Sequence, residues 1–236
     1  MFIWTNETIQ FYKDAAQFNK YHEVLRGMIA PFIAEEDHVL DLGCGLGFLS
    51  LELAQICEKV TAIDHEERVL HLLQEGVTRK NIANIHVQKQ IWEDISHTAQ
   101  WDVVLASFFG KLPEDMDKLL QMCKKRVIVI SSNGSSPEFL PNTKKRLSRK
   151  TTREAVDILQ DTHRITHYEE GVLEFGQPFK TKDEAFEFVA HYREEVDEKM
   201  IKRHLEKYLV AIDEVDFSFY LPNQKNIGIY VVEKDF

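Results

Sequence analysis

The sequence of 236 residues has few of the features that mark secreted, metal-bound or membrane-spanning proteins. Its three cysteines, Cys44, Cys57 and Cys123, are far apart and form no CxxC or Cys/His cluster. A sparse, odd count fits a reducing compartment and argues against a structural metal. The N-terminus has no basic start followed by an apolar core, and no apolar run approaches the roughly 20 residues that span a bilayer. These absences predict a cytoplasmic protein without metal or membrane segment.

The sequence also lacks an excess of basic residues. It has 39 acidic against 29 basic residues and a net charge of −10. Proteins that bind nucleic acid gain much of their affinity from positive charge that displaces counterions. The charge balance therefore argues against a nucleic-acid substrate and favours a small molecule.

The first half of the chain contains short apolar runs separated by helical patterns. Near-continuous apolar strands alternating with helices of about 10–15 residues are typical of βαβ units, whose parallel sheet is covered on both faces. Five strands are predicted: 38–42, 60–64, 85–88, 101–107 and 126–131. A helical segment from Thr8 to Ile33 precedes them, with Pro31 near its end or at a break.

The second half has a different pattern. Residues 133–214 read as an elaboration with a helix near 152–161, an extended stretch at 171–175 and a long helical stretch from 182 to 210. Val215–Tyr220 and Ile227–Glu233 alternate in polarity and predict an antiparallel pair that completes the core sheet. We expect one domain overall, divided into 1–132, 133–214 and 215–236, with the middle part over the substrate side of the sheet.

A glycine-rich loop joins the first strand to the following helix. Gly43, Gly45 and Gly47 stand at every second position, so the backbone can turn sharply and approach a ligand closely. The carboxyl end of a parallel strand beside a helix N-terminus is the usual binding crevice of such sheets. Asp64, at the end of the second strand and 23 residues after Asp41, can accept hydrogen bonds from both hydroxyls of a ribose.

Two classes of cofactor compete for this loop. The dinucleotide fingerprint G-x-G-x-x-G places its third glycine where this chain has Phe48, and the carboxylate of Asp41 would be a poor neighbour for a pyrophosphate. Both departures argue against a nicotinamide-dependent oxidoreductase, which stays as an alternative.

The segment Val39–Gly47, VLDLGCGLG, resembles the first motif of the class I S-adenosylmethionine (SAM)-dependent methyltransferases. The similarity continues through the fifth strand, over roughly half of the chain. It implies an α/β fold with a doubly wound, mostly parallel seven-stranded sheet, the Rossmann-like methyltransferase fold, and a helical and extended insertion before the last strands. It also implies SAM as cofactor and S-adenosylhomocysteine (SAH) as product.

The resemblance assigns cofactor contacts to nine positions of this sequence. In the family the glycine loop lies against the methionine half of SAM, the acid after the second strand binds the ribose, and the loop after the third strand surrounds the adenine. The matching residues here are Asp41, Gly43, Cys44, Gly45, Asp64, His65, Trp92, Glu93 and Ser107. The family often has an aspartate at the position where this chain has Ile91.

Methyl transfer from a sulfonium is an in-line displacement that depends mainly on alignment, so no dedicated base is obligatory. The sequence accordingly singles out no catalytic side chain, and a non-catalytic SAM-binding protein stays a second alternative. It gives neither the acceptor atom nor the oligomeric state. The motif Asn/Asp-Pro-Pro-Tyr of amine-methylating nucleic-acid enzymes is absent, since the fourth strand ends Ala106-Ser107-Phe108-Phe109-Gly110.

Two further features have alternative interpretations. The basic run at 142–153 fits a solvated loop and helix start better than a clamp for an anionic substrate or RNA. Among the aromatic residues of the first helical segment, Phe11 fits the core, whereas Tyr12 and Tyr21 fit either core or cofactor cover. Six aromatic residues in the elaboration suit either an apolar small-molecule pocket or simple packing: Tyr168, Phe175, Phe179, Phe186, Phe188 and Tyr192.

Overall fold

The computed structural model describes residues 4–96, 98, 100–135, 139–141, 151–193 and 195–234. The chain divides into two compact units. Unit 1 comprises residues 1–21, 133–149 and 171–226, and unit 2 comprises residues 22–132, 150–170 and 227–236. The predicted segmentation into 1–132, 133–214 and 215–236 stays a prediction.

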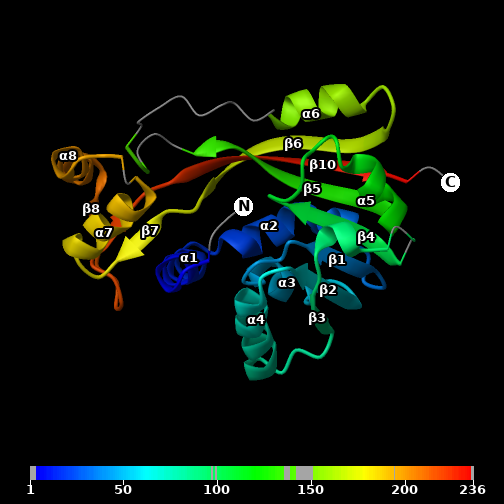
Figure 1. Ribbon diagram of the computed structural model, residues 1–236, viewed down its shortest axis with the longest axis horizontal. Helices are drawn as coiled ribbons and strands as arrows, with labels where there is room; N and C mark the ends of the chain where they lie inside the picture. The colour runs from blue at the N-terminus through cyan, green and yellow to red at the C-terminus, as the bar shows by residue number, and fades with distance from the viewer. Residues whose placement is uncertain are drawn as a thin grey trace. The chain divides into compact units, whose positions relative to one another are not determined.

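A seven-stranded sheet with the order β3-β2-β1-β4-β5-β10-β6 forms the core of unit 2 (Figure 1). Strands β3, β2, β1, β4 and β5 pair in parallel along this order. The strands are β1 (His38–Leu42), β2 (Lys59–Asp64), β3 (Ile85–Lys89), β4 (Trp101–Ser107), β5 (Cys123–Ser135), β6 (Arg164–Glu174) and β10 (Gln224–Glu233). The predicted fold class, a doubly wound and mostly parallel seven-stranded sheet, is confirmed.

Alternate residues of the strands supply two apolar layers. On one face, Leu40, Val104 and Val127 pack with side chains of α5 and α6; on the other, Ala62 packs against α4. This alternation is the period of two expected of strands that are covered on both faces. The helical segments are α2 (Tyr21–Ile29), η1 (Ala30–Phe32), α3 (Phe48–Leu53), α4 (Glu67–Arg79), η2 (Trp92–Asp94), α5 (Met116–Met122) and α6 (Thr152–Leu159).

Unit 1 has a small sheet of its own and an aromatic core. The sheet has the order β7-β9-β8, with both pairs antiparallel. The core centres on Phe179 and Phe188, and Phe11 packs edge-on against Phe188 with ring centroids 4.9 Å apart. The elements are α1 (Asn6–Asn19), β7 (Gln177–Phe179), α7 (Lys182–Tyr192), α8 (Glu198–Tyr208), β8 (Val210–Ala211) and β9 (Phe219–Leu221).

Three expectations for individual elements are wrong. Val215–Tyr220 does not join the core sheet, because β9 pairs with β7 and β8, and the seventh strand is β6 instead. The long helix from 182 to 210 is two helices, since the side chain of Asp197 caps a new one by accepting from the Met200 amide at 2.8 Å. The first helical segment is also divided, at Lys20, whose φ of 52° ends α1.

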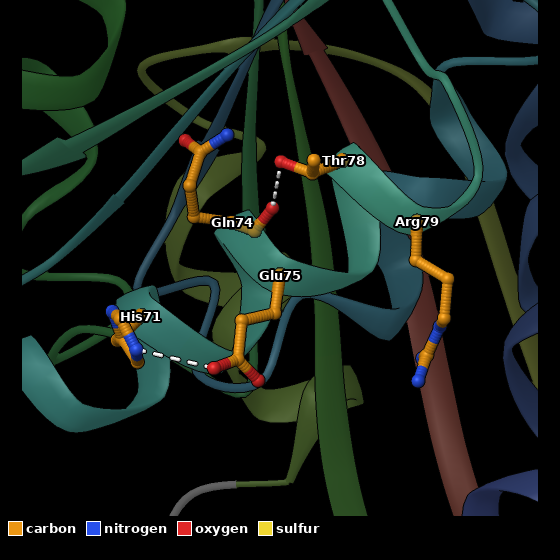
Figure 2. A pocket seen from close by; sticks show the side chains of 5 residues that line it. All are labelled: His71, Gln74, Glu75, Thr78 and Arg79. Atoms are coloured by element: carbon orange, nitrogen blue, oxygen red, sulfur yellow. Dashed lines mark hydrogen bonds and ion pairs between the residues drawn. The ribbon is translucent and has the colours of Figure 1, made fainter.

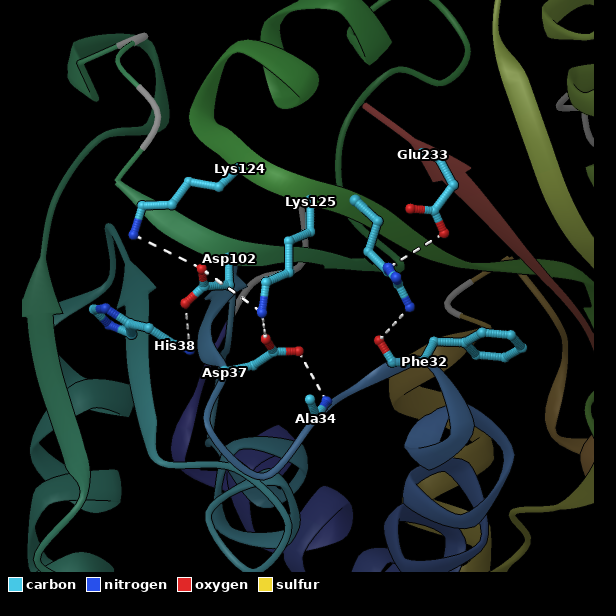
Figure 3. Close-up of polar contacts among 9 residues, drawn as sticks. Phe32, Ala34, Asp37, His38, Asp102, Lys124, Lys125 and Glu233 are labelled. Carbon is cyan, nitrogen blue, oxygen red and sulfur yellow. Dashed lines mark hydrogen bonds and ion pairs between the residues drawn. The ribbon is translucent and has the colours of Figure 1, made fainter. Parts of the chain in front are cut away.

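A cluster of charged residues lies at the edge of the sheet where β1, β4 and β5 begin (Figure 3). The ammonium of Lys125 contacts the carboxylate of Asp37 and lies 4.0 Å from that of Asp102. Asp37 also accepts from the Ala34 amide at 2.8 Å, and Asp102 from the His38 amide at 2.9 Å. Since parallel strands share their direction, this edge is opposite to the one where the glycine loop begins.

Candidate cofactor site

The loop after β1 depends on three glycines in the left-handed region. Gly43, Gly45 and Gly47 have φ values of 73°, 53° and 72°, which cost a side-chain-bearing residue roughly 1–2 kcal/mol each. The amides of Gly43 and Cys44 both donate to the carbonyl of Ile63, at 2.8 and 3.0 Å. These bonds fix the loop to β2, at the residue before Asp64.

Asp64 joins the loop from the end of β2. Its Oδ2 accepts from the Gly45 amide at 2.9 Å, and its Oδ1 accepts from the Glu66 amide at 3.0 Å. The ring of His65 is half-exposed, with Nδ1 3.1 Å from Oδ1 of Asp64. A carboxylate offers about four lone-pair directions, so each oxygen of Asp64 retains acceptor capacity beyond these amides.

Asp41 lies in β1, before the loop, rather than in the loop itself. It is 2% exposed, and its Oδ2 accepts from the hydroxyl of Ser50 on α3 at 2.5 Å. Burial raises the pKa of Asp41 to about 6, the Ser50 hydrogen bond opposes the rise, and the nearby charge of Asp64 adds to it. Burial, together with Asp41 and Asp64, also raises the pKa of the Cys44 thiol well above its usual value. Cys44 is therefore a neutral small side chain in this loop and not a nucleophile.

The loop after β3 is fixed through the ring and carbonyl of Trp92. The ammonium of Lys118 lies 3.6 Å from the centroid of the Trp92 ring and donates to the Trp92 carbonyl at 3.1 Å. On another side, the ring contacts Phe109 edge-on with centroids 5.9 Å apart. Glu93, on the same short turn, is exposed, as is Ile91 before it.

The end of β4 brings Ser107 and two phenylalanines to the same edge of the sheet. Ser107 is half-buried, and Phe108 adopts a φ of 54°, an unusual value for a bulky side chain. The ring of Phe109 covers Gly43, because a Cβ on that glycine would lie 2.2 Å from Cδ2 of the ring. The glycine loop, the Trp92 turn and the end of β4 are thus connected through Phe109.

All nine residues predicted from the resemblance lie in unit 2 at the carboxyl edge of the sheet. A hydrogen bond joins the loop to Asp64, and the ring of Phe109 links Trp92 to Gly43 of the loop. Among the described residues, the side chains of Glu93 and Ser107 form no hydrogen bond with this group. Ser50, Phe109 and Lys118 were not predicted. Only their tertiary contacts identify them, since serine, phenylalanine and lysine at these places carry no pattern of their own.

A surface hollow on α4 is lined by residues of that helix alone: His71, Gln74, Glu75, Thr78 and Arg79 (Figure 2). Two contacts join residues of this lining: His71 pairs with Glu75 at 3.1 Å, and the Thr78 hydroxyl donates to the Gln74 carbonyl at 2.9 Å. A hollow on the side of one helix, with none of the loop residues in its lining, is not a cofactor site.

Two kinds of feature are absent from the described part of the chain. Its helices are too short or too polar to cross a membrane. In the same residues, histidine, cysteine and acidic side chains form no group of three or more that could hold a metal ion. Most of the predicted basic run, residues 142–150, lies outside the described residues. Arg153, at the end of the run, pairs with Asp157 at 3.0 Å.

The sheet order, the glycine loop after β1 and the carboxylate at the end of β2 define an α/β fold of the Rossmann-like type. Residues 39–128 match the family model described as "Methyltransferase domain". The resemblance to the class I SAM-dependent methyltransferases is therefore confirmed for this part of the chain, and SAM is the cofactor of that family.

Relatives and solved structures agree with this family. The chain is 27% identical over 94 residues to a "Probable cobalt-precorrin-6B C(15)-methyltransferase (decarboxylating)" of Methanocaldococcus jannaschii, covering 40% of this chain and 49% of that one. It is 27% identical over 144 residues to the ribosomal protein L11 methyltransferase of Thermotoga maritima, covering 56% and 52%. The structure of a SAM-dependent methyltransferase from Aquifex aeolicus has a TM-score of 0.54 at 17% identity, covering 100% of both chains, and so shares the fold. The chain spans about half the length of the two curated relatives.

Proposed function

We propose that this protein is a SAM-dependent methyltransferase whose acceptor is a small molecule. The observation that carries the proposal is the hydrogen bond between the Gly45 amide and Asp64, which joins the glycine loop to the carboxylate at the end of β2. When bound, SAM supplies a methyl group activated by its sulfonium, and the protein needs mainly to hold donor and acceptor in line.

The residues of unit 2 fit the cofactor in three ways. Asp64 is oriented by two amides and retains lone pairs for ribose hydroxyls. The glycines give the loop a surface without side chains, against which the methionine half would lie. Trp92, held by Lys118, offers a flat apolar face suited to adenine. The proposed contacts also include those of His65, Glu93, Cys44 and Ser107. The carboxylate of Asp41 would balance the positive charge of SAM.

A small acceptor is favoured by charge. The net charge of −10 opposes approach to the phosphates of RNA. The relatives' names cover both kinds of acceptor, a cobalt-precorrin and a ribosomal protein, and so do not decide between them.

The three cysteines are free thiols, which supports a reducing, cytoplasmic setting.

The test combines calorimetry with turnover. SAM and SAH should bind the full chain, and Asp64→Ala should weaken both by about tenfold or more, since hydrogen bonds to a charged group contribute roughly 1.5–3 kcal/mol. Asp213→Asn, an exposed acid of unit 1, is the matched control and should bind as the wild type. Failure of SAH to bind the wild type would overturn the proposal. Binding without SAH release from SAM across a panel of small acceptors would instead identify a non-catalytic SAM-binding protein.

A further inference from the structure

One lysine of unit 2 makes two contacts with the same tryptophan. Nζ of Lys118 lies 3.6 Å from the centroid of the Trp92 ring and donates to the Trp92 carbonyl at 3.1 Å. The electron-rich face of an indole attracts a cation at this distance, and the hydrogen bond holds the backbone of the same residue. Ring and backbone of Trp92 are therefore both fixed by one ammonium.

The two partners belong to elements that differ in burial. Lys118 is on α5, and the buried residues of this helix, each at most 1% exposed, are Met116, Leu119 and Met122. Trp92 is the first residue of η2, a turn of three residues, none of which is buried. Because the helix is packed into the core and the turn is not, Lys118 fixes the place of the ring, and not the reverse.

The place of the Trp92 ring matters to the candidate cofactor site because the ring is connected to the glycine loop. Its centroid lies 5.9 Å from that of Phe109 in an edge-on contact, and the Phe109 ring covers Gly43. Trp92 is only partly buried, so part of its surface can contact a ligand. A ring held from α5 and connected to the loop is suited to define where a purine lies.

We propose that Lys118 is a positioning residue for the adenine of the cofactor and acts on it through the Trp92 ring. The physical reason is preorganisation, since a ring that already stands in its bound place loses less conformational freedom when the purine packs against it. This role rests on the proposed function, because the cofactor supplies the purine that Trp92 would contact.

The test measures the affinity of the full chain for two probes by titration calorimetry. SAH carries the adenine and an amino-acid carboxylate, whereas 5′-methylthioadenosine carries the adenine and no carboxylate. Lys118→Met should weaken both probes by the same factor, about fivefold or more, because its effect acts on the adenine that they share. Lys118→Arg also places a cation over the ring and should stay within about twofold of the wild type.

A double-mutant cycle determines whether Lys118 acts through the ring. Trp92→Leu removes the indole, so adding Lys118→Met to it should cost less than about twofold in affinity for either probe. Lys118→Gln can still donate to the Trp92 carbonyl but places no charge over the ring, and it should weaken both probes as Lys118→Met does. It also takes the place of Lys118→Met if that variant does not fold, as judged by circular dichroism.

The matched control is Lys80→Met. Lys80 is an exposed lysine that follows α4 in the same unit, and its loss changes the net charge by the same amount. This variant should bind SAH and 5′-methylthioadenosine as the wild type does. A weakening equal to that of Lys118→Met would show a general effect of charge and would overturn the proposed role.

Three further results would overturn the proposal: unchanged affinity for both probes in a folded Lys118→Met, a loss confined to SAH, or equal losses with and without the indole. A loss confined to SAH would mean that the ammonium attracts the carboxylate directly. If the wild type does not bind SAH, the proposed function fails, and this role fails with it. If the wild type binds SAH and any of the three results is found, the proposed function stands and the role of Lys118 alone fails.

Discussion

Two opposed effects act on the pKa of the Asp41 side chain. Its burial disfavours the carboxylate and raises its pKa to about 6, while the Ser50 hydroxyl stabilises the carboxylate through a 2.5 Å hydrogen bond. Because the pKa in the fold is above the ordinary value of 3.8, the folded protein binds more protons than the unfolded chain between these two pH values. Ionisation of Asp41 therefore destabilises the fold as pH rises through this window.

Asp41→Asn should accordingly stabilise the protein at pH 8 and not at pH 3.5. The amide carries no charge to desolvate, and its oxygen can still accept from Ser50. The gain in free energy of unfolding at pH 8 is expected to be about 2–3 kcal/mol, the equivalent of a shift of roughly two pKa units. Urea denaturation at the two pH values measures it.

The same variant should bind SAM more weakly at pH 8, since the negative charge proposed to face the cationic cofactor is lost. Stability and affinity then change in opposite directions, which a merely structural carboxylate would not produce. Equal SAM affinity in Asp41→Asn and the wild type would remove Asp41 from the proposed site, and an unchanged stability at pH 8 would contradict the burial argument.

At the scale of elements, the glycine loop and α4 fit together because Gly47 has no side chain. A Cβ at this position would lie 2.3 Å from Cδ1 of Leu73 on α4, and Leu73 is 1% exposed. The backbone of Gly47 also has a φ of 72° where α3 begins. Conformation and close packing thus both require glycine here.

Gly47→Ala should lower the free energy of unfolding by about 2–4 kcal/mol, combining the left-handed backbone with overpacking against a buried leucine. Gly27→Ala is the matched control, because Gly27 lies within α2 and, apart from its chain neighbours and the backbone of its own helix, no atom lies within 4 Å of its would-be Cβ. That change should stabilise by about 0.5–1 kcal/mol, the helix preference for alanine. Guanidinium denaturation compares the two, and similar effects of both would refute the close-packing argument.

At the scale of the whole molecule, the two edges of the large sheet have different roles. The carboxyl edge bears the candidate cofactor site, whereas the opposite edge bears the cluster around Lys125 and Asp37 (Figure 3). Asp37 is 2% exposed, and its Oδ1 accepts a hydrogen bond from the Lys125 ammonium. The hydrogen bond to Asp37 raises the pKa of Lys125, so this contribution to stability is complete below the ordinary pKa of 10.5 and is lost as pH rises beyond it.

Lys125→Met should therefore destabilise the protein by about 1–3 kcal/mol at pH 7, because it leaves a buried carboxylate without its cation. The difference from the wild type should shrink above pH 10.5. Thermal denaturation measures stability and calorimetry measures SAH affinity, which should not change. A loss of SAH affinity with stability intact would contradict the division of roles between the edges.

The sequence by itself determined the parts of this protein that depend on local patterns. The strands at 38–42 and 101–107 were predicted at their observed bounds, since short apolar runs of this kind indicate a buried strand. The alternate glycines predicted a sharply turning loop, which the structure forms with positive φ values. Asp64 was predicted at the end of the second strand, and it is the last residue of β2.

Only the tertiary structure decided which distant segments meet. The segments 215–220 and 227–233 were predicted to pair with each other, yet β9 pairs in the small sheet and β10 in the large one, because sheet membership depends on partners far away in the chain. The bond of Ser50 to Asp41, the ring of Phe109 on Gly43 and the ammonium of Lys118 over the Trp92 ring have the same origin. Local spacing fixes the direction of a side chain along its own element, whereas its neighbour, and with it charge and burial, is set by packing between elements.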